Sequence, residues 1–198
     1  VTKRAGALKV GPGSDRQADL GPLVNPHARQ RVLRLIDSGV EQGARLLLDG
    51  RQCTVPGYES GNFVGPTIFS DVKVGMDIYQ QEIFGPVLNV VCVETLEEAI
   101  ALINANPNGN GTSIFTSSGW AARKYQHDIN VGQVGINVPI PVPVAYFSFT
   151  GSRASKMGDL GPNGKQAVQF WTQTKTVTAR WFEDGSASEG LNTTISMK

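Results

Sequence analysis

The sequence predicts an α/β fold with a largely parallel sheet and flanking helices. Three short apolar segments, at 86–93, 111–116 and 134–138, have the composition of strands, and an amphipathic helix is predicted between each consecutive pair. Strands that alternate with helices of about ten residues pair in parallel through right-handed crossovers. With 198 residues, of which 40% are apolar, the chain is long enough to bury a substantial core.

Composition narrows the classes of function. Eighteen basic residues against 17 acidic residues leave a net charge of +1, so no strong overall field attracts nucleic acid or an anionic membrane. No segment approaches the roughly 20 apolar residues that a membrane-spanning helix needs. Two cysteines are too few for a disulfide framework, which favours a reducing, intracellular compartment. The chain starts at Val1 rather than at a Met, and we expect it to be part of a longer one.

The first half predicts one long helix and three strands. A short helix and a Gly/Pro-rich turn region occupy 1–24, after which Asn25-Pro26 has the pattern of an N-cap followed by proline at the first helical position. Gly43 predicts a left-handed cap at the other end of this helix. The apolar face of the helix carries Val32, Leu35, Ile36 and Gly39. Strands are predicted at Ala44–Leu48, Phe63–Phe69 and Pro86–Val93, the first buried and the last buried on both faces.

The second half continues the alternation of helices and strands. Thr95 and Glu98 have the spacing of a capping box, and Asn106-Pro107 ends the helix that follows. A strand is predicted at 111–116, a helix capped by Ser118 runs to about Ile129, and a further strand covers 134–138.

The C-terminal part differs in composition. Prolines at every second position from 139 to 143 exclude a central strand, so 139–163 is predicted as a long ordered loop, and such loops tend to carry function. Residues 169–182 have the alternating Thr, Val and aromatic pattern of a strand that pairs at an edge or with another subunit. We therefore expect an α/β domain over 1–168, an oligomerisation strand over 169–182 and a polar tail over 183–198.

Most residues with reactive side chains favour structural interpretations. Cys53 lies in a polar turn with no histidine near it in sequence, and Cys92 is predicted to be a small core residue. His27 and His127 have no partner at metal-ligand spacing and are predicted to lie on helix surfaces, so no metal site is expected. A phosphate-binding loop at 159–166 fails, because Asp159 replaces its first glycine and Gln166 follows its lysine. The helix arginines Arg29, Arg31 and Arg34 are predicted to form a solvated face, with phosphate binding as the alternative.

Glu82 and Phe84 stand out from this background. They precede the predicted strand at 86–93, where a carboxylate can accept hydrogen bonds from a ribose diol and an aromatic ring can face a flat one. From these residues alone, a surface glutamate in a turn is an equal alternative.

The motifs around these residues resemble the aldehyde dehydrogenase superfamily. Five stretches carry the likeness in the order of that family: Asp19–Leu23, Gly61–Ile68, Glu82–Val87, Asn110–Thr116 and Gly132–Asn137. Phe147–Arg153 departs from the common motif of the family, as do the prolines before it. Together with 174–181, this departure resembles the CoA-acylating methylmalonate-semialdehyde branch, which also acts on malonate semialdehyde.

The resemblance implies a fold, a reaction and roles for four residues. An enzyme cysteine attacks the aldehyde, hydride passes to NAD, carbon dioxide is lost and the acyl group passes to CoA, giving propionyl-CoA or acetyl-CoA. By the same resemblance, Glu82 holds the nicotinamide ribose and Phe84 packs near the nicotinamide, whereas Pro143 and Phe149 belong to the wall of the substrate pocket. The family's nucleophilic cysteine and cofactor domain precede Gly21-Pro22, so no catalytic residue is expected in this chain.

The resemblance also implies assembly and location. The parent enzyme would be a homo-oligomer, dimer or tetramer, in which Thr172–Ala179 extends a neighbouring subunit's sheet. It would be cytoplasmic in a bacterium and mitochondrial in a eukaryote, without nucleic-acid or membrane partners. Two alternatives remain: a non-catalytic module that self-associates through 169–181, and a free-standing nucleotide-binding protein.

Overall fold

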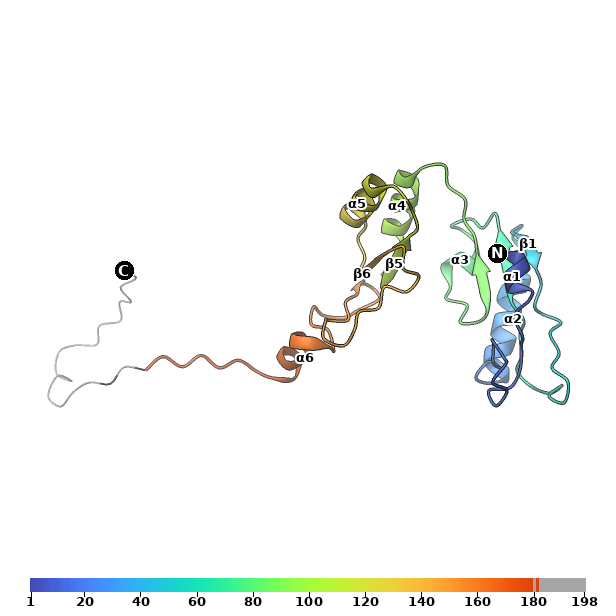
Figure 1. Cartoon of the computed structure of the whole chain (residues 1–198), viewed down its shortest axis with the longest axis horizontal. Coiled ribbons are helices and arrows are strands. Elements are labelled where there is room, and N and C mark those ends of the chain that lie inside the picture. Colours follow the sequence, from blue (N-terminus) through green and yellow to red (C-terminus); the bar gives the residue numbers. More distant parts are fainter. Residues whose placement is uncertain (180, 182–198) are drawn as a thin grey trace. The chain divides into compact units, whose positions relative to one another are not determined.

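The computed structural model describes residues 1–179 and 181, and it confirms the α/β fold class (Figure 1). The chain divides into two compact units, Val1–Glu98 and Ala99–Lys198. Among the described helices, none is long and apolar enough to cross a membrane.

The first unit is organised around helix α2 (Pro26–Glu41), which follows the one-turn helix α1 (Thr2–Ala5). Asn25 caps α2 as predicted, because its Oδ1 accepts a hydrogen bond from the Ala28 amide at 2.8 Å. Beyond the other end, Gly43 has a φ of 88°, which confirms the predicted left-handed turn. The apolar face of α2 is buried as predicted, with Ile36 completely inaccessible.

This face packs against a three-stranded sheet of order β1-β2-β3. Strand β1 (Arg45–Leu48) runs antiparallel to β2 (Thr67–Ser70), and β3 (Val87–Asn89) runs parallel to β2. All four residues of the central strand are buried, and the short helix α3 (Asp77–Gln80) contributes Ile78 to the same core.

Three burial predictions in this unit are wrong. Strand β1 alternates between exposed and half-buried residues, and Leu88 of β3 is 47% exposed, because among the described strands each of these two pairs with β2 alone. Cys92 is exposed rather than a core residue, since the backbone hydrogen bonds between this segment and the β2 side end at Val90 in the described chain.

The second unit begins within helix α4 (Leu96–Ala105). The predicted cap is confirmed, because the Glu98 amide donates to Thr95 Oγ1 at 3.1 Å. Parallel strands β5 (Gly111–Ile114) and β6 (Gln133–Ile136) flank helix α5 (Gly119–Asp128), as predicted, and Ser118 caps α5. The predicted parallel pairing is thus confirmed for β5 and β6, whereas β3 belongs to the sheet of the first unit.

The C-terminal ends of helices α4 and α5, which lie side by side in Figure 1, are joined by hydrogen bonds of Asn104. The Asn104 side chain donates to Asp128 O at 2.9 Å and accepts from the Asn130 amide at 2.7 Å. The predicted loop over 139–163 contains only strand β7 (Ser152–Arg153), which pairs with β4 (Asn108–Gly109).

The C-terminal prediction is corrected at its start. Helix α6 (Gly164–Trp171) includes the first three residues of the segment predicted as a strand, and Thr172 Oγ1 donates to Val168 O at 2.6 Å where the helix ends. The regular alternation of threonines begins only at Thr172, which explains the error. Residues 172–179 have no strand partner in the described chain, so the oligomerisation strand remains a prediction from Thr172 onward. The predicted tail over 183–198 lies outside the described residues.

Candidate functional site

The segment that carries Glu82 and Phe84 connects α3 to β3. Ile83 is 8% exposed and belongs to the core, whereas the residues on both sides of it are exposed, Phe84 to 77%. Phe84 also has a φ of 57°, a left-handed conformation that is uncommon for an aromatic residue. Ile83 thus anchors the segment, while a carboxylate and an aromatic ring face outward from one short turn.

Helix α2 contacts this segment through a hydrogen-bonding side chain and through close packing. Arg31 donates from Nη2 to Glu82 O at 2.6 Å and from Nη1 to Ile83 O at 2.8 Å. Gly85 lies directly on the helix, because a Cβ atom built there would be 2.9 Å and 3.0 Å from the two methyl carbons of Val32. The Glu82–Phe84 turn and Gly85 are therefore joined to α2 by the hydrogen bonds of Arg31 and by close packing on Val32.

The prediction of a solvated face is wrong for two of the three arginines of α2. Arg31 binds the two carbonyl oxygens just described, and Arg29 Nε donates to Phe63 O at 3.2 Å, so neither belongs to a purely solvated face. Arg34 is exposed, as predicted. The sequence did contain one indication that Arg31 is not fully solvated, because it directly precedes Val32, which lies on the buried face of the helix.

The arrangement can bind a diol next to a flat ring. In the described part of the chain, the Glu82 carboxylate forms no hydrogen bond or ion pair, so its oxygens are free to accept from two adjacent hydroxyls. The exposed Phe84 ring offers an apolar face two residues away. These groups fit the nicotinamide-ribose end of NAD, a role that the resemblance assigned to both residues.

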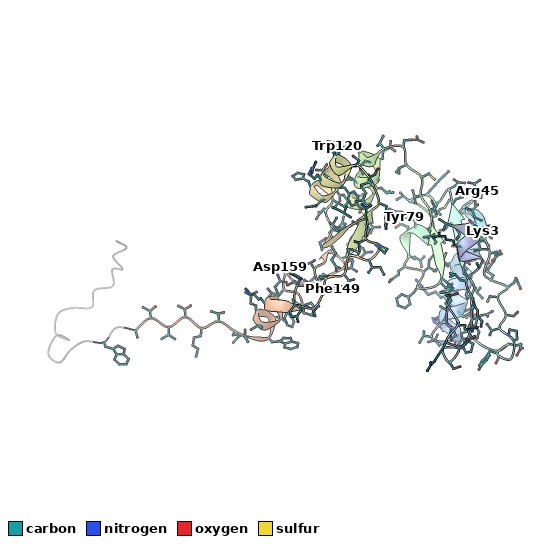
Figure 2. The ribbon with its side chains drawn as sticks, in the orientation of Figure 1. Lys3, Arg45, Tyr79, Trp120, Phe149 and Asp159 are labelled. Carbon is teal, nitrogen blue, oxygen red and sulfur yellow. The ribbon has the colours of Figure 1, made fainter. Side chains whose placement is uncertain are left out.

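The second predicted pair lies in the second unit. Pro143 and Phe149 are half-buried in the loop between β6 and β7 (Figure 2, where Phe149 is labelled). Thr150, the residue after Phe149, is held in place because its Oγ1 donates a hydrogen bond to Gly132 O at 2.5 Å. The buried side chain of Gln133 donates to Thr150 O at 2.7 Å. The loop around Phe149 is thereby attached to the start of β6.

Arg153 attaches the other end of the same loop, a contact that the sequence analysis missed. Its Nη1 donates to Asn104 O at 2.5 Å and Ile103 O at 3.3 Å, at the C-terminal end of α4. A cation at this end of a helix interacts favourably with the helix dipole. Arg153 has a φ of 55°, so its backbone is also in the left-handed region.

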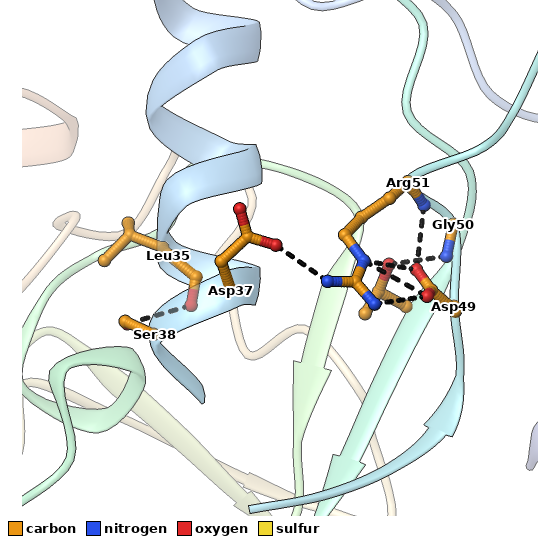
Figure 3. Close-up of polar contacts among 7 residues, drawn as sticks. Leu35, Asp37, Ser38, Asp49, Gly50 and Arg51 are labelled. Carbon is orange, nitrogen blue, oxygen red and sulfur yellow. Dashed lines mark hydrogen bonds and ion pairs between the residues drawn. The ribbon is translucent and has the colours of Figure 1, made fainter. Parts of the chain in front are cut away.

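An ionic cluster attaches α2 to the turn after β1 (Figure 3). Arg51 binds Asp37 of α2 at 2.7 Å and Asp49 of the turn at 2.6 Å. The hydrogen bond from Arg51 is the main reason that the pKa of Asp49 lies below its ordinary value, although partial burial opposes it. The cluster thus stabilises the helix on which the Glu82 segment rests.

The described residues offer no assembled nucleophile or metal centre. Cys53 is half-buried and Cys92 is exposed. His27 and His127 are exposed on α2 and α5, which confirms the prediction for both. Among the described residues, no three His, Cys, Asp or Glu side chains lie close enough together to hold a metal ion.

Comparison with solved structures gives the same fold at close similarity. Methylmalonate-semialdehyde dehydrogenase from Oceanimonas doudoroffii matches with a TM-score of 0.89 and 49% identity, over 93% of this chain and 38% of that one. An aldehyde dehydrogenase from Mycobacterium tuberculosis, solved in complex with NAD+, matches with a TM-score of 0.73 and 38% identity, over 84% and 34% of the two chains.

Sequence comparison finds relatives with the same semialdehyde dehydrogenase name. The chain is 58% identical over 187 residues to the mitochondrial acylating methylmalonate-semialdehyde/malonate-semialdehyde dehydrogenase of Bos taurus, which covers 94% of this chain and 35% of that protein. A probable enzyme of the same name from Dictyostelium discoideum is 54% identical over all 198 residues, or 37% of its own length. The chain therefore spans about a third of the length of these relatives. The aldehyde dehydrogenase family model matches residues 1–177, and the chain belongs to the aldehyde dehydrogenase family.

Proposed function

We propose that this chain is the C-terminal part of an NAD-dependent, CoA-acylating dehydrogenase of methylmalonate and malonate semialdehydes. The observation that carries the proposal is the Glu82–Phe84 turn, which Arg31 holds on α2 and which carries an exposed ring and a carboxylate without a partner among the described residues. Relatives at 54% to 58% identity that bear the acylating semialdehyde dehydrogenase name support the substrate class.

The proposed reaction balances with one NAD and one CoA. The aldehyde carbon is oxidised by two electrons, which leave it as one hydride, and NAD would accept this hydride when bound. The neighbouring carboxyl group leaves as carbon dioxide, its carbon–carbon bond electrons taking up a proton, and the acyl group ends on the sulfur of CoA. Methylmalonate semialdehyde would then give propionyl-CoA, and malonate semialdehyde would give acetyl-CoA.

The residues of this chain bind and orient rather than react. Glu82 would accept hydrogen bonds from the two ribose hydroxyls, and Phe84 would pack against the nicotinamide side of the cofactor. Pro143 and Phe149 would contribute the wall of the substrate pocket. The nucleophilic cysteine would come from sequence upstream of Val1, since neither Cys53 nor Cys92 has a histidine or another base as a hydrogen-bond partner in the described residues.

The assay compares this chain with the protein made from the coding region extended upstream. Both receive NAD, CoA and methylmalonate semialdehyde, and NADH and acyl-CoA are measured together. We expect no turnover by the 198-residue chain and one NADH per propionyl-CoA from the extended protein. NADH formation without CoA dependence would overturn the acylating assignment, and turnover by the short chain would overturn the upstream cysteine.

Assembly and location are part of the same proposal. We expect a homo-oligomer joined through Thr172–Ala179, in the mitochondrial matrix of a eukaryote or the cytoplasm of a bacterium. The non-catalytic module described above makes a different prediction, namely that the chain self-associates while the extended protein stays inactive. Sedimentation of the extended protein beside its NADH assay separates the two.

A further inference from the structure

In the first unit, a side chain of α2 forms two hydrogen bonds with the backbone of the Glu82–Phe84 turn. One guanidinium group binds two consecutive backbone carbonyls, Glu82 O at 2.6 Å and Ile83 O at 2.8 Å. Building on the proposed function, we propose that Arg31 is a positioning residue for the nicotinamide site. It acts through the backbone of the turn and presents the Glu82 carboxylate and the Phe84 ring together.

The geometry of a guanidinium suits this task. Its planar fork donates two hydrogen bonds in fixed relative directions, so it specifies the orientation of both peptide units rather than a single distance. The next residue, Phe84, has a φ of 57°, a conformation that the surrounding contacts must maintain. Arg31 is half-buried, so water competes only partly for these hydrogen bonds.

The turn has few other polar attachments that would do the same. Beyond Gly85 the chain is fixed by the Thr67 amide, which donates to Pro86 O at 2.9 Å. On the other side, the Gln81 amide donates to Asp77 O at 2.9 Å, within the last turn of α3. Between these anchors, Arg31 provides the side-chain hydrogen bonds to the backbone of Glu82 and Ile83 among the described residues.

A role through the backbone predicts coupling between Arg31 and Glu82. If Arg31 serves NAD binding by orienting Glu82, then removing Arg31 costs affinity only while Glu82 is present. If Arg31 bound the cofactor itself, the two losses would multiply. A purely structural role would lower the melting temperature and weaken the binding of NAD and aldehyde alike.

The test measures the NAD dissociation constant, the aldehyde KM and the melting temperature in the protein extended by its upstream coding region. The variants are Arg31→Met, Arg31→Lys, Glu82→Gln and the double variant Arg31→Met/Glu82→Gln. The matched control is Arg34→Met, on the next turn of the same helix, where the side chain is exposed and forms no hydrogen bond to a described residue.

We expect Arg31→Met to raise the NAD dissociation constant about tenfold, with Arg31→Lys in between, because an ammonium group cannot bind both carbonyls in the fork geometry. The double variant should bind NAD about as weakly as the weaker single variant, rather than about a hundredfold worse. The aldehyde KM and the Arg34→Met control should stay at the parent values.

Each other outcome has a definite meaning. Multiplying losses in the double variant, or equal losses in Arg31→Met and Arg34→Met, would overturn the positioning role. If Arg31→Met does not fold, the ratio of Arg31→Lys to the parent and its coupling to Glu82→Gln decide the question in the same way. Absence of NAD binding by the unsubstituted protein would instead refute the proposed function.

Discussion

Replacing Gly85 by alanine should push the Glu82–Phe84 turn away from α2, because the added methyl group would overlap Val32. The backbone of Gly85 is outside the left-handed region, so alanine adds no conformational strain. Its Cβ would lie 2.9 Å and 3.0 Å from the Val32 methyl carbons, whereas carbon atoms in favourable contact are about 3.5–4.0 Å apart. Val32 is 1% exposed and has no room to move away.

The cost follows from this overlap. Relieving it requires a shift of roughly 0.5–1 Å in a packed core, and overpacking of this kind costs about 1–3 kcal/mol. Val32→Ala removes both methyl groups and by itself costs about 1.6 kcal/mol of buried apolar surface. In the double variant the Cβ of residue 32 is 3.5 Å away, an ordinary contact, so the two costs should combine to less than their sum.

Amide hydrogen exchange of 26–41 in the 198-residue chain measures the free energy of opening of α2 directly. Gly85→Ala should lower it by about 2 kcal/mol, and Gly75→Ala, where an added Cβ meets nothing within 4 Å, should leave it unchanged or slightly raised. If the losses in free energy of opening caused by Gly85→Ala and Val32→Ala were fully additive, or if exchange were unaltered in Gly85→Ala, close packing of Gly85 on Val32 would be refuted.

Two further predictions concern the stability of α2 and use the same exchange measurement. Asn25→Ala removes the cap on the Ala28 amide and should lower the free energy of opening by about 1 kcal/mol, while Asn25→Asp should retain it. Because Arg51 lowers the pKa of Asp49 in the folded chain, this contribution is complete above the ordinary value of 3.8 and is lost as the pH falls through the lowered folded value. Acidification below about pH 4 should therefore lower the free energy of opening of α2 in the parent, and this free energy should depend less on pH in Asp49→Asn; equal dependence in both would exclude the ion pair as the cause.

Local signals in the sequence were sufficient for most of the helices. Asn25, Thr95 and Ser118 each have a side chain that satisfies a backbone donor in the first helical turn, an interaction that depends only on neighbouring residues. The parallel pairing of β5 and β6 followed from the helix between them. These features were predictable because their causes lie within a few residues of sequence.

Burial and long-range contacts were not predictable in this way. Leu88 and Cys92 belong to an apolar run that reads as a buried strand, yet their exposure depends on which strands lie beside β3. Arg31 looked like one of several surface arginines, because its partners are about fifty residues away in the chain. For Glu82 and Phe84, local reasoning left two equal interpretations, and the structure adds their common exposure and their attachment to α2.

We propose Glu82 as the cofactor-binding carboxylate of this chain. The direct test is the KM for NAD of Glu82→Gln in the protein extended by its upstream coding region, with Glu59→Gln, an exposed glutamate that binds the Gly57 amide, as the control. Exchanging a charged for a neutral acceptor should raise the KM for NAD about tenfold and leave the aldehyde KM unchanged. Equal NAD kinetics for the two variants would contradict the account.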